Sequence, residues 1–433
     1  MTLAVTAPRF MMGATAPLVD EPVSAGLVGL QPSRLVRIRA AALDANGARF
    51  SSWACYRADQ DGTAQPARHD ALTGTYEGVD PFGLWWSMRG EPGAVLGDGL
   101  PPLTTSLTAE VDGESVAEVN FQRLRLGHGV EVSPVDDPDL AGKLFAPPAG
   151  HGPGLVILGG SGGGFDWSEE AAALLASRGF VALALAYFGL PPAPPSLQEV
   201  ALEYVGKAIS WLLGTMTVSG KRVGVVGCSR GGELALLAGS TFPDVGAVVG
   251  YVPSAVVWNG LGTAEAARRS AWASGGAPLP FLYPVGVPVS ASTRRVPRVM
   301  LSSFERALAD EQPVDAATIP VERIRGPLLL ISAGRDLLWP SRTLCELAMS
   351  RLARACHGFP SRHLCYRTAG HQLSTLPGLP APPVVRIHPR DGRSYSLGGS
   401  REANSAAAVD AWPRILRFLD RALGPGALPR NPS

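Results

Sequence analysis

Features that mark several classes of protein are scarce in this 433-residue sequence. Lysine occurs only at Lys143, Lys207 and Lys221, and the net charge is +1. A nearly neutral chain has no electrostatic reason to bind nucleic acid or an anionic membrane surface, so neither is a predicted partner. The longest apolar run, about residues 179–190, is too short to span a bilayer.

Cysteine is also sparse, and its distribution excludes a disulfide framework. The five cysteines are scattered, odd in number and form no C-x-x-C pair: Cys55, Cys228, Cys345, Cys356 and Cys365. Such a set is typical of free thiols in a reducing compartment. The opening MTLAVTAPRFMMGATAP lacks a basic segment and is interrupted by Pro8 and Arg9, which does not fit a signal peptide. We therefore expect a cytoplasmic protein.

The first third of the chain alternates apolar and polar residues with period two. The strand-like stretches LVRIRAAAL, ARFSSWACYRA, GLWWSM and AEVNFQRLRL are separated by turn signals such as Asn-Gly and Asp-Gly. Short strands without intervening helices predict an antiparallel, immunoglobulin-like β-sandwich over residues 18–134. Residues 1–17 are expected to be a flexible leader.

After about Pro134 the pattern changes to continuous apolar runs that alternate with helical segments. LVILGG and FVALALAY are predicted buried strands, whereas SEEAAALLASRG and residues 197–213 are predicted helices. This alternation is typical of a mostly parallel sheet with helices on both faces, which we place at 135–423. Residues 250–320, rich in Gly, Pro and Trp, are predicted to form a lid or pocket wall, and 424–433 a flexible tail.

A G-x-S-x-G motif, Gly227 to Gly231, lies between the predicted strand RVGVVG and a helical segment. This context predicts a nucleophile elbow, in which Ser229 stands on a sharp turn and the flanking glycines avoid collisions with the neighbouring strand and helix. The motif also occurs by chance in glycine-rich chains, but the strand and helix around it favour the nucleophile. Cys228, at the x position, is interpreted as a packing residue.

A serine nucleophile needs a base, and the base needs an acid that orients it. On this kind of sheet the chain order is serine, acid, histidine. Asp336 follows the predicted strand PLLLIS, whereas Asp310 and Asp315 precede that strand and Asp391 lies after the good histidine candidates. Among seven histidines, His371 alone lies in a loop, opened by Gly370, directly after a late strand; the others are His69, His128, His151, His357, His363 and His388. Asp336 and His371 are therefore the predicted acid and base.

The negative charge of a tetrahedral intermediate needs backbone donors. We expect the amide of Arg230 and one from the loop GGSGGG, at Gly160 or Ser161, to supply them. The same loop could instead hold phosphate, but no Lys-Ser/Thr and no ribose-binding acid follow it. A zinc site drawn from Cys356, His357, His363 and Cys365 matches no common spacing. No cofactor and no metal are predicted.

With these residues assigned, the chain resembles the acyl-coenzyme A thioesterase and bile acid-CoA:amino acid N-acyltransferase family. The resemblance covers nearly the whole sequence and is most specific in GGSGGGFDWSEEAAALLASRGFVALALAYFG, GCSRGGELALLAG, IPVERIRGPLLLISAGRDLLWPS and YRTAGH. It implies a β-sandwich followed by an α/β-hydrolase domain, with Ser229, Asp336 and His371 as nucleophile, acid and base. Many relatives have two adjacent acidic residues at the acid position, but here Arg335 replaces the first.

The resemblance also implies that serine marks the thioesterases of this family and cysteine the transferases. Because Ser229 would form an oxygen ester that water resolves readily, we expect hydrolysis of an acyl-CoA or acyl-carrier thioester. Three alternatives stay open: acyl transfer to an amine or alcohol, including chain release from a carrier protein; a carboxylesterase; and a binding module whose hydrolase domain is idle.

Overall fold

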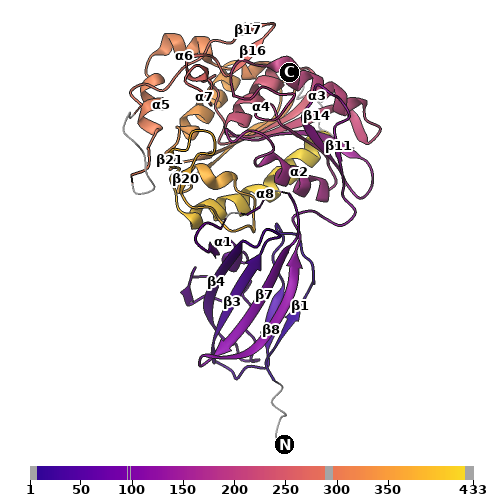
Figure 1. The fold of residues 1–433 in the computed structure, drawn as a ribbon, viewed down its shortest axis with the longest axis vertical. Helices are drawn as coiled ribbons and strands as arrows, with labels where there is room; N and C mark the ends of the chain where they lie inside the picture. The colour runs from indigo at the N-terminus through magenta and orange to yellow at the C-terminus, as the bar shows by residue number, and fades with distance from the viewer. Residues whose placement is uncertain (1–6, 95, 98, 288–295, 425–433) are drawn as a thin grey trace, which may run out of the picture. The chain divides into compact units, whose positions relative to one another are not determined.

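The computed structural model describes residues 7–94, 96–97, 99–287 and 296–424 (Figure 1). The chain forms two compact units, Met1–Gly127 with Thr375–Pro382, and His128–Ser374 with Pro383–Ser433. The first unit thus ends before the expected boundary at 134. Strand β9 (Glu131–Pro134) accounts for the difference, because it pairs with β10 (Gly142–Ala146) in the sheet of the second unit.

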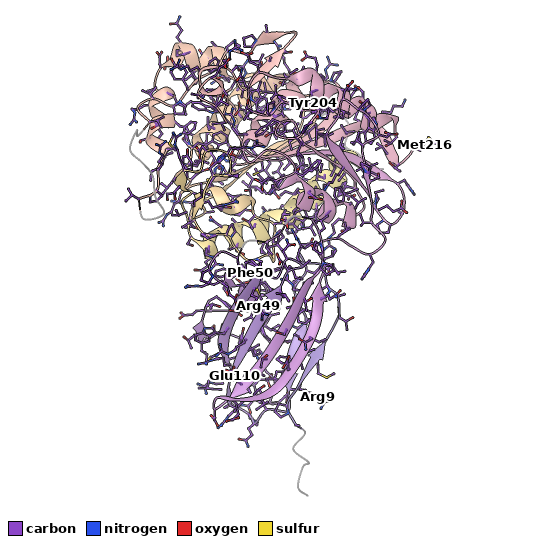
Figure 2. The ribbon with its side chains drawn as sticks, viewed as in Figure 1. Arg9, Arg49, Phe50, Glu110, Tyr204 and Met216 are labelled. Atoms are coloured by element: carbon purple, nitrogen blue, oxygen red, sulfur yellow. The ribbon has the colours of Figure 1, made fainter. Side chains whose placement is uncertain are left out.

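The first unit contains two antiparallel sheets, as the alternating pattern predicts. The larger joins β5 (Thr73–Gly74), β4 (Arg49–Arg57), β3 (Leu35–Leu43), β7 (Leu103–Val111) and β8 (Glu114–Arg123), with β6 (Arg89–Gly90) beside β4. Along β4, Arg49 is exposed and Phe50 is buried (Figure 2). One face of the sheet therefore supplies the core of this unit.

Part of the expected leader is a strand. β1 (Arg9–Met12) pairs with β2 (Ala25–Val28) in the smaller sheet, and the side chains of Phe10 and Met12 are half-buried. The residues RFMM alternate between exposed and half-buried side chains, and the edge of β2 supplies their hydrogen-bonding partners, so this segment forms a strand. Residues 1–6, together with 425–433 of the expected tail, lie outside the described residues.

The stretch GLWWSM is not the strand that we predicted. Residues Gly83–Trp86 form the short helix α1, and all four are buried. Asp80 explains the difference, because its carboxylate accepts hydrogen bonds from the backbone N–H of Phe82 at 2.7 Å and from Trp86 Nε1 at 2.7 Å. The turn thus begins before the apolar run, and both tryptophans are buried instead of alternating between faces.

The second unit is built on an eight-stranded, mostly parallel sheet, which confirms the predicted α/β architecture. Its order is β19 (Ser361–Tyr366), β18 (Leu328–Ala333), β15 (Val245–Tyr251), β14 (Val218–Cys228), β11 (Gly152–Leu158), β12 (Val181–Leu185), β10 and β9. The six strands from β19 to β12 are parallel, and β10 and β9 are each antiparallel to their neighbour. Strands β12, β15 and β18 are buried along their whole length, as a sheet covered on both faces requires.

Helices cover both faces of this sheet (Figure 1). On one side lie α3 (Leu202–Gly214), α4 (Arg230–Thr241) and α7 (Ser341–Arg354), and on the other α2 (Ser168–Ser177) and α8 (Arg401–Leu423). Helix α3 starts later than the expected residue 197 because β13 (Val200–Ala201) instead pairs with β16 (Trp272–Ser274). Among the described residues no helix has both the length and the apolar character needed to cross a bilayer.

The insertion after β15 consists of short elements. The 3₁₀ turn η1 (Ala266–Arg268) and β16 are followed by β17 (Ala277–Pro278), α5 (Leu301–Ala307) and α6 (Glu311–Ala317). Residues 288–295 of this segment lie outside the described part of the chain. Trp258 and Trp272 are fully buried, so the part of the insertion that carries them is packed against the domain.

Arg123 is a fully buried cation at the end of β8 in the first unit. Its guanidinium donates to the carbonyls of Val19 at 2.8 Å and Gly378 at 2.7 Å and lies over the Trp85 ring. We expect Arg123→Met to lower the free energy of unfolding by about 2–4 kcal/mol, because two buried carbonyls lose their donor. Urea denaturation measures the change.

The matched control is Arg39→Met, which removes an exposed arginine paired with Glu110 on the same sheet. Surface pairs contribute about 1 kcal/mol or less, so this variant should unfold close to the wild type. Equal stability losses in the two variants would contradict the role given to Arg123.

Candidate active site

Ser229 occupies a strained turn between β14 and α4. Its backbone has φ of 54° and ψ of −114°, which a residue with a side chain rarely adopts. The backbone N–H of Ser229 donates to the carbonyl of Tyr251 on the neighbouring strand β15 at 2.8 Å. The turn is thereby fixed to the sheet, and the serine stands at the start of helix α4.

Glycine is required on both sides of this turn. A Cβ at Gly227 would lie 2.0 Å from the carbonyl oxygen of Gly231, and a Cβ at Gly231 would lie 2.2 Å from that of Gly159. Both distances are far below any real contact with a Cβ atom, and the atoms involved belong to the backbone. The G-x-S-x-G spacing therefore follows from the space available in the turn.

The three predicted catalytic side chains meet in a hydrogen-bonded row. His371 Nε2 lies 3.0 Å from Ser229 Oγ, and His371 Nδ1 lies 2.8 Å from Asp336 Oδ2. All three residues are buried, with relative exposures of 7% for Ser229, 4% for Asp336 and 8% for His371. In this arrangement Nδ1–H donates to the carboxylate, and Nε2 is free to accept the serine proton.

Asp336 is oriented by backbone groups that follow it. Its Oδ1 accepts the N–H of Leu338 at 3.0 Å and that of Trp339 at 3.2 Å, which leaves Oδ2 for His371. Hydrogen bonds from backbone N–H groups stabilise an ionised carboxylate. The acid is thus held just after β18 in one orientation, with Oδ2 directed at His371.

The loop that carries His371 is held from two sides. The backbone N–H of Gly370 donates to Asn404 Oδ1 on α8 at 2.6 Å, and that of His371 donates to the carbonyl of Leu397 at 2.8 Å. The Trp339 ring lies edge-on to the imidazole at 5.8 Å. Sequence reasoning missed Asn404 and Trp339, because no motif marks them.

The expected oxyanion donors lie beside the serine. A Cβ at Gly160 would be 3.6 Å from Ser229 Cβ, so this part of the loop lies beside Ser229. Among the described residues, the backbone N–H groups of Gly160, Ser161 and Arg230 donate to no protein acceptor. Free amides beside a nucleophile are what an oxyanion hole requires.

The Arg230 side chain forms a buried ion pair with Glu233 one turn along α4. Arg230 Nη1 lies 2.9 Å from Glu233 Oε2, and both side chains are inaccessible or nearly so. Glu233 Oε1 accepts from the backbone N–H of Trp258 at 3.0 Å and from Trp272 Nε1 at 2.6 Å. The pair thus ties the insertion to helix α4, which begins directly after Ser229. Sequence reasoning missed Glu233, whose signal is a single charge within the apolar run ELALLAG.

The other side chains weighed from the sequence lie elsewhere or have structural partners. Burial raises the pKa of Cys228 to about 12, so this thiol is protonated and packs beside the serine. His363 Nε2 lies 2.7 Å from Ser332 Oγ, and His357 Nε2 faces the carbonyl of Ile324 at 2.7 Å. The described residues include no group of three or more His, Cys, Asp or Glu side chains suited to a metal ion.

This fold, with its serine, histidine and aspartate at the carboxyl ends of parallel strands, is that of the α/β-hydrolases. Residues 200–425 match the family described as "BAAT / Acyl-CoA thioester hydrolase C terminal", and residues 20–137 match "Acyl-CoA thioester hydrolase/BAAT N-terminal region". The chain belongs to this family.

Named relatives match along almost the entire chain. Acyl-coenzyme A thioesterase 1 of Homo sapiens is 33% identical over 420 residues, covering 94% of each chain. Peroxisomal succinyl-coenzyme A thioesterase of Mus musculus is 30% identical over 421 residues, again covering 94% of each chain. A solved puromycin-hydrolysing peptidase of Mycobacterium tuberculosis has 15% identity and a TM-score of 0.43, covering 93% of this chain and 55% of its own, and so adds nothing to the assignment.

The Arg230–Glu233 pair predicts a specific pH dependence of stability. Burial raises the pKa of Glu233 from 4.5 to about 7 despite the nearby guanidinium, whose Nη1 lies 2.9 Å from Oε2 but is not aligned for a hydrogen bond. Folded Glu233 therefore holds its proton more tightly than the unfolded chain does, so stability falls as pH rises from 4.5 to 7. Relative to Glu233→Gln, the wild type should lose on the order of 3 kcal/mol across this window.

Urea denaturation of both proteins at pH 5 and pH 7.5 measures the difference. Gln keeps an oxygen for Trp258 and Trp272 but does not titrate, which makes it the matched reference. A wild type that gains stability relative to Glu233→Gln as pH rises would mean that attraction to Arg230 outweighs burial.

Proposed function

We propose that the protein is an acyl-CoA thioesterase that forms an acyl-enzyme at Ser229. The observation that carries the proposal is the hydrogen-bonded row of Ser229, His371 and Asp336 in a chain of this family. Relatives named as acyl-coenzyme A thioesterases, at about a third identity, support the substrate class.

In the proposed mechanism, Ser229 Oγ attacks the thioester carbonyl while His371 Nε2 takes its proton. Asp336 stabilises the imidazolium that results, and the amides of Arg230 and of Gly160 or Ser161 bind the oxyanion. The carbon–sulfur bond breaks, and the coenzyme A thiolate takes up the proton that His371 holds, which returns the imidazole to its neutral form. Because a thiolate leaves readily, this step needs little help from an acid. His371 then takes a proton from water, whose oxygen attacks the acyl-enzyme, and passes that proton to Ser229 Oγ as the carboxylic acid is released.

Serine at position 229 favours hydrolysis over transfer. An acyl-cysteine is itself a thioester and reacts well with amines, whereas an acyl-serine is an oxygen ester that water resolves. The family also includes transferases. Hydrolysis and transfer therefore differ in the molecule that accepts the acyl group from the enzyme: water in the first, an amine or alcohol in the second.

We also propose the cytoplasm as the location. The five cysteines, all free thiols in the structure, support a reducing compartment. Relatives include proteins named as mitochondrial and as peroxisomal, so fractionation of the native cells is the test.

Replacing the nucleophile tests the mechanism. Ser229→Ala should lower kcat for a medium-chain acyl-CoA by roughly 10⁴-fold or more, because the acyl-enzyme cannot form. Release of free thiol, followed with a thiol-reactive dye, measures the rate. The matched control is Ser240→Ala on the helix that follows Ser229, whose hydroxyl donates to the carbonyl of Leu237. A Ser229→Ala protein as active as Ser240→Ala would refute the mechanism.

A competition experiment separates hydrolysis from transfer and from simple ester cleavage. The wild type receives acyl-CoA with millimolar glycine or taurine, and mass spectrometry identifies the products. We expect free acid and no amide, because water resolves the serine ester. An amide as the main product would establish an acyltransferase, and faster turnover of the matching oxygen ester would establish a carboxylesterase.

A further inference from the structure

The loop Gly159–Gly164, here called the glycine loop, has five glycines among its six residues. Glycine backbones are freer than any others, and fixing them costs more entropy. An oxyanion hole works only if its donors are already in place when charge develops. Groups outside the loop must therefore hold it.

Both ends of the glycine loop are fixed by the chain segment after β12. Tyr187 donates its hydroxyl to the carbonyls of Gly159 at 2.8 Å and Gly160 at 3.2 Å. At the other end, the backbone N–H of Gly164 donates to the carbonyl of Phe188 at 2.9 Å. These contacts leave the middle of the loop, Ser161 and Gly162, to be held by something else.

The middle of the loop is held by a hairpin more than two hundred residues further along the chain. The hairpin pairs β20 (Val385–Ile387) with β21 (Ser394–Ser396). In its turn, His388 Nε2 lies 2.9 Å from Ser161 Oγ, and Arg390 Nε donates to the carbonyl of Gly162 at 2.8 Å.

The Arg390 side chain lies in a space that only glycine leaves open. A Cβ at Gly163 would lie 2.3 Å from Arg390 Nη2, and a Cβ at Gly189 would lie 1.8 Å from it. The guanidinium also lies over the Phe188 ring at 5.1 Å. The hairpin turn thus fits into the loop through several independent contacts.

The hydrogen bonds of His388 fix its tautomer. The backbone N–H of Arg390 donates to His388 Nδ1 at 3.3 Å, so in the neutral imidazole the proton is on Nε2. Burial lowers the pKa of His388, which keeps the ring neutral at pH 7. Nε2–H therefore donates to Ser161 Oγ, and this bond holds the residue next to Gly160, which lies beside Ser229.

We propose that His388 is a positioning residue for the oxyanion hole. Through Ser161 it holds the glycine loop in the conformation in which the amides of Gly160 and Ser161 meet the developing negative charge. This inference rests on the proposed role of Ser229 as nucleophile, and it adds a second histidine that does not touch the reacting atoms.

Kinetics of His388 variants test the proposal. His388→Ala should lower kcat for acyl-CoA about ten- to a hundredfold with KM near the wild type, less than the loss on deleting a whole oxyanion donor. His388→Gln keeps a side-chain N–H for Ser161 and should recover most of the rate. In a Ser161→Ala background, His388→Ala should cost nothing further, because its partner is already gone.

The rate of labelling of Ser229 by a fluorophosphonate gives a readout that does not depend on the substrate. The phosphonyl oxygen also develops charge during the reaction, so His388→Ala should label more slowly by a similar factor. If the wild type labels at Ser229 but hydrolyses no acyl-CoA, the proposed function fails while the labelling rates still decide the role of His388.

The matched control is Arg393→Ala, an exposed side chain of the same turn that lies near Asp391. It should leave both rates at the wild-type level. Wild-type rates in His388→Ala would overturn the proposal, as would additive losses of His388→Ala and Ser161→Ala. A loss shared equally by Arg393→Ala would also overturn it, since it would reflect general disturbance of the turn.

Discussion

The turn at Ser229 is the constraint on which the rest of this structure depends. A non-glycine residue at positive φ costs about 1–3 kcal/mol and persists only where its surroundings hold it. Here the hydrogen bond to Tyr251 and the close backbone approaches at Gly227 and Gly231 hold it. In this conformation the hydroxyl of Ser229 lies at the start of helix α4, with the backbone amide of Arg230 directly beside it.

The parallel sheet then brings the partners of that hydroxyl to the same edge. Strands β14, β18 and β19 all end there, and the segments that follow them supply Ser229, Asp336 and His371. Strand order alone would leave the last two as mobile loop residues. Backbone donors to Asp336, and the bonds from Gly370 and His371 to Asn404 and Leu397, turn those loops into fixed supports.

A further layer of contacts comes from segments that lie far from the site in sequence. Glu233 joins helix α4 to Trp258 and Trp272 of the insertion, and the turn at His388 and Arg390 meets the glycine loop. These polar groups are buried or half-buried, so each must find its partner for the fold to be stable. Family membership and the serine at position 229 point to thioester hydrolysis, and this layer shows how a glycine-rich loop can be held by distant side chains.

The sequence by itself was enough to identify the alternating sheets, the parallel α/β domain, the elbow at Ser229 and the candidates Asp336 and His371. Periodicity and glycine spacing report local backbone geometry and which face is buried, so these features are readable one segment at a time. The predictions for GLWWSM and for the start of the chain were wrong. The Asp80 carboxylate accepts from Phe82 and starts a helix at GLWWSM, and the edge of β2 pairs with residues 9–12 as a strand. Only the tertiary structure revealed Glu233, Asn404 and His388, because each acts through a partner distant in sequence, and periodicity does not say which buried side chains become neighbours.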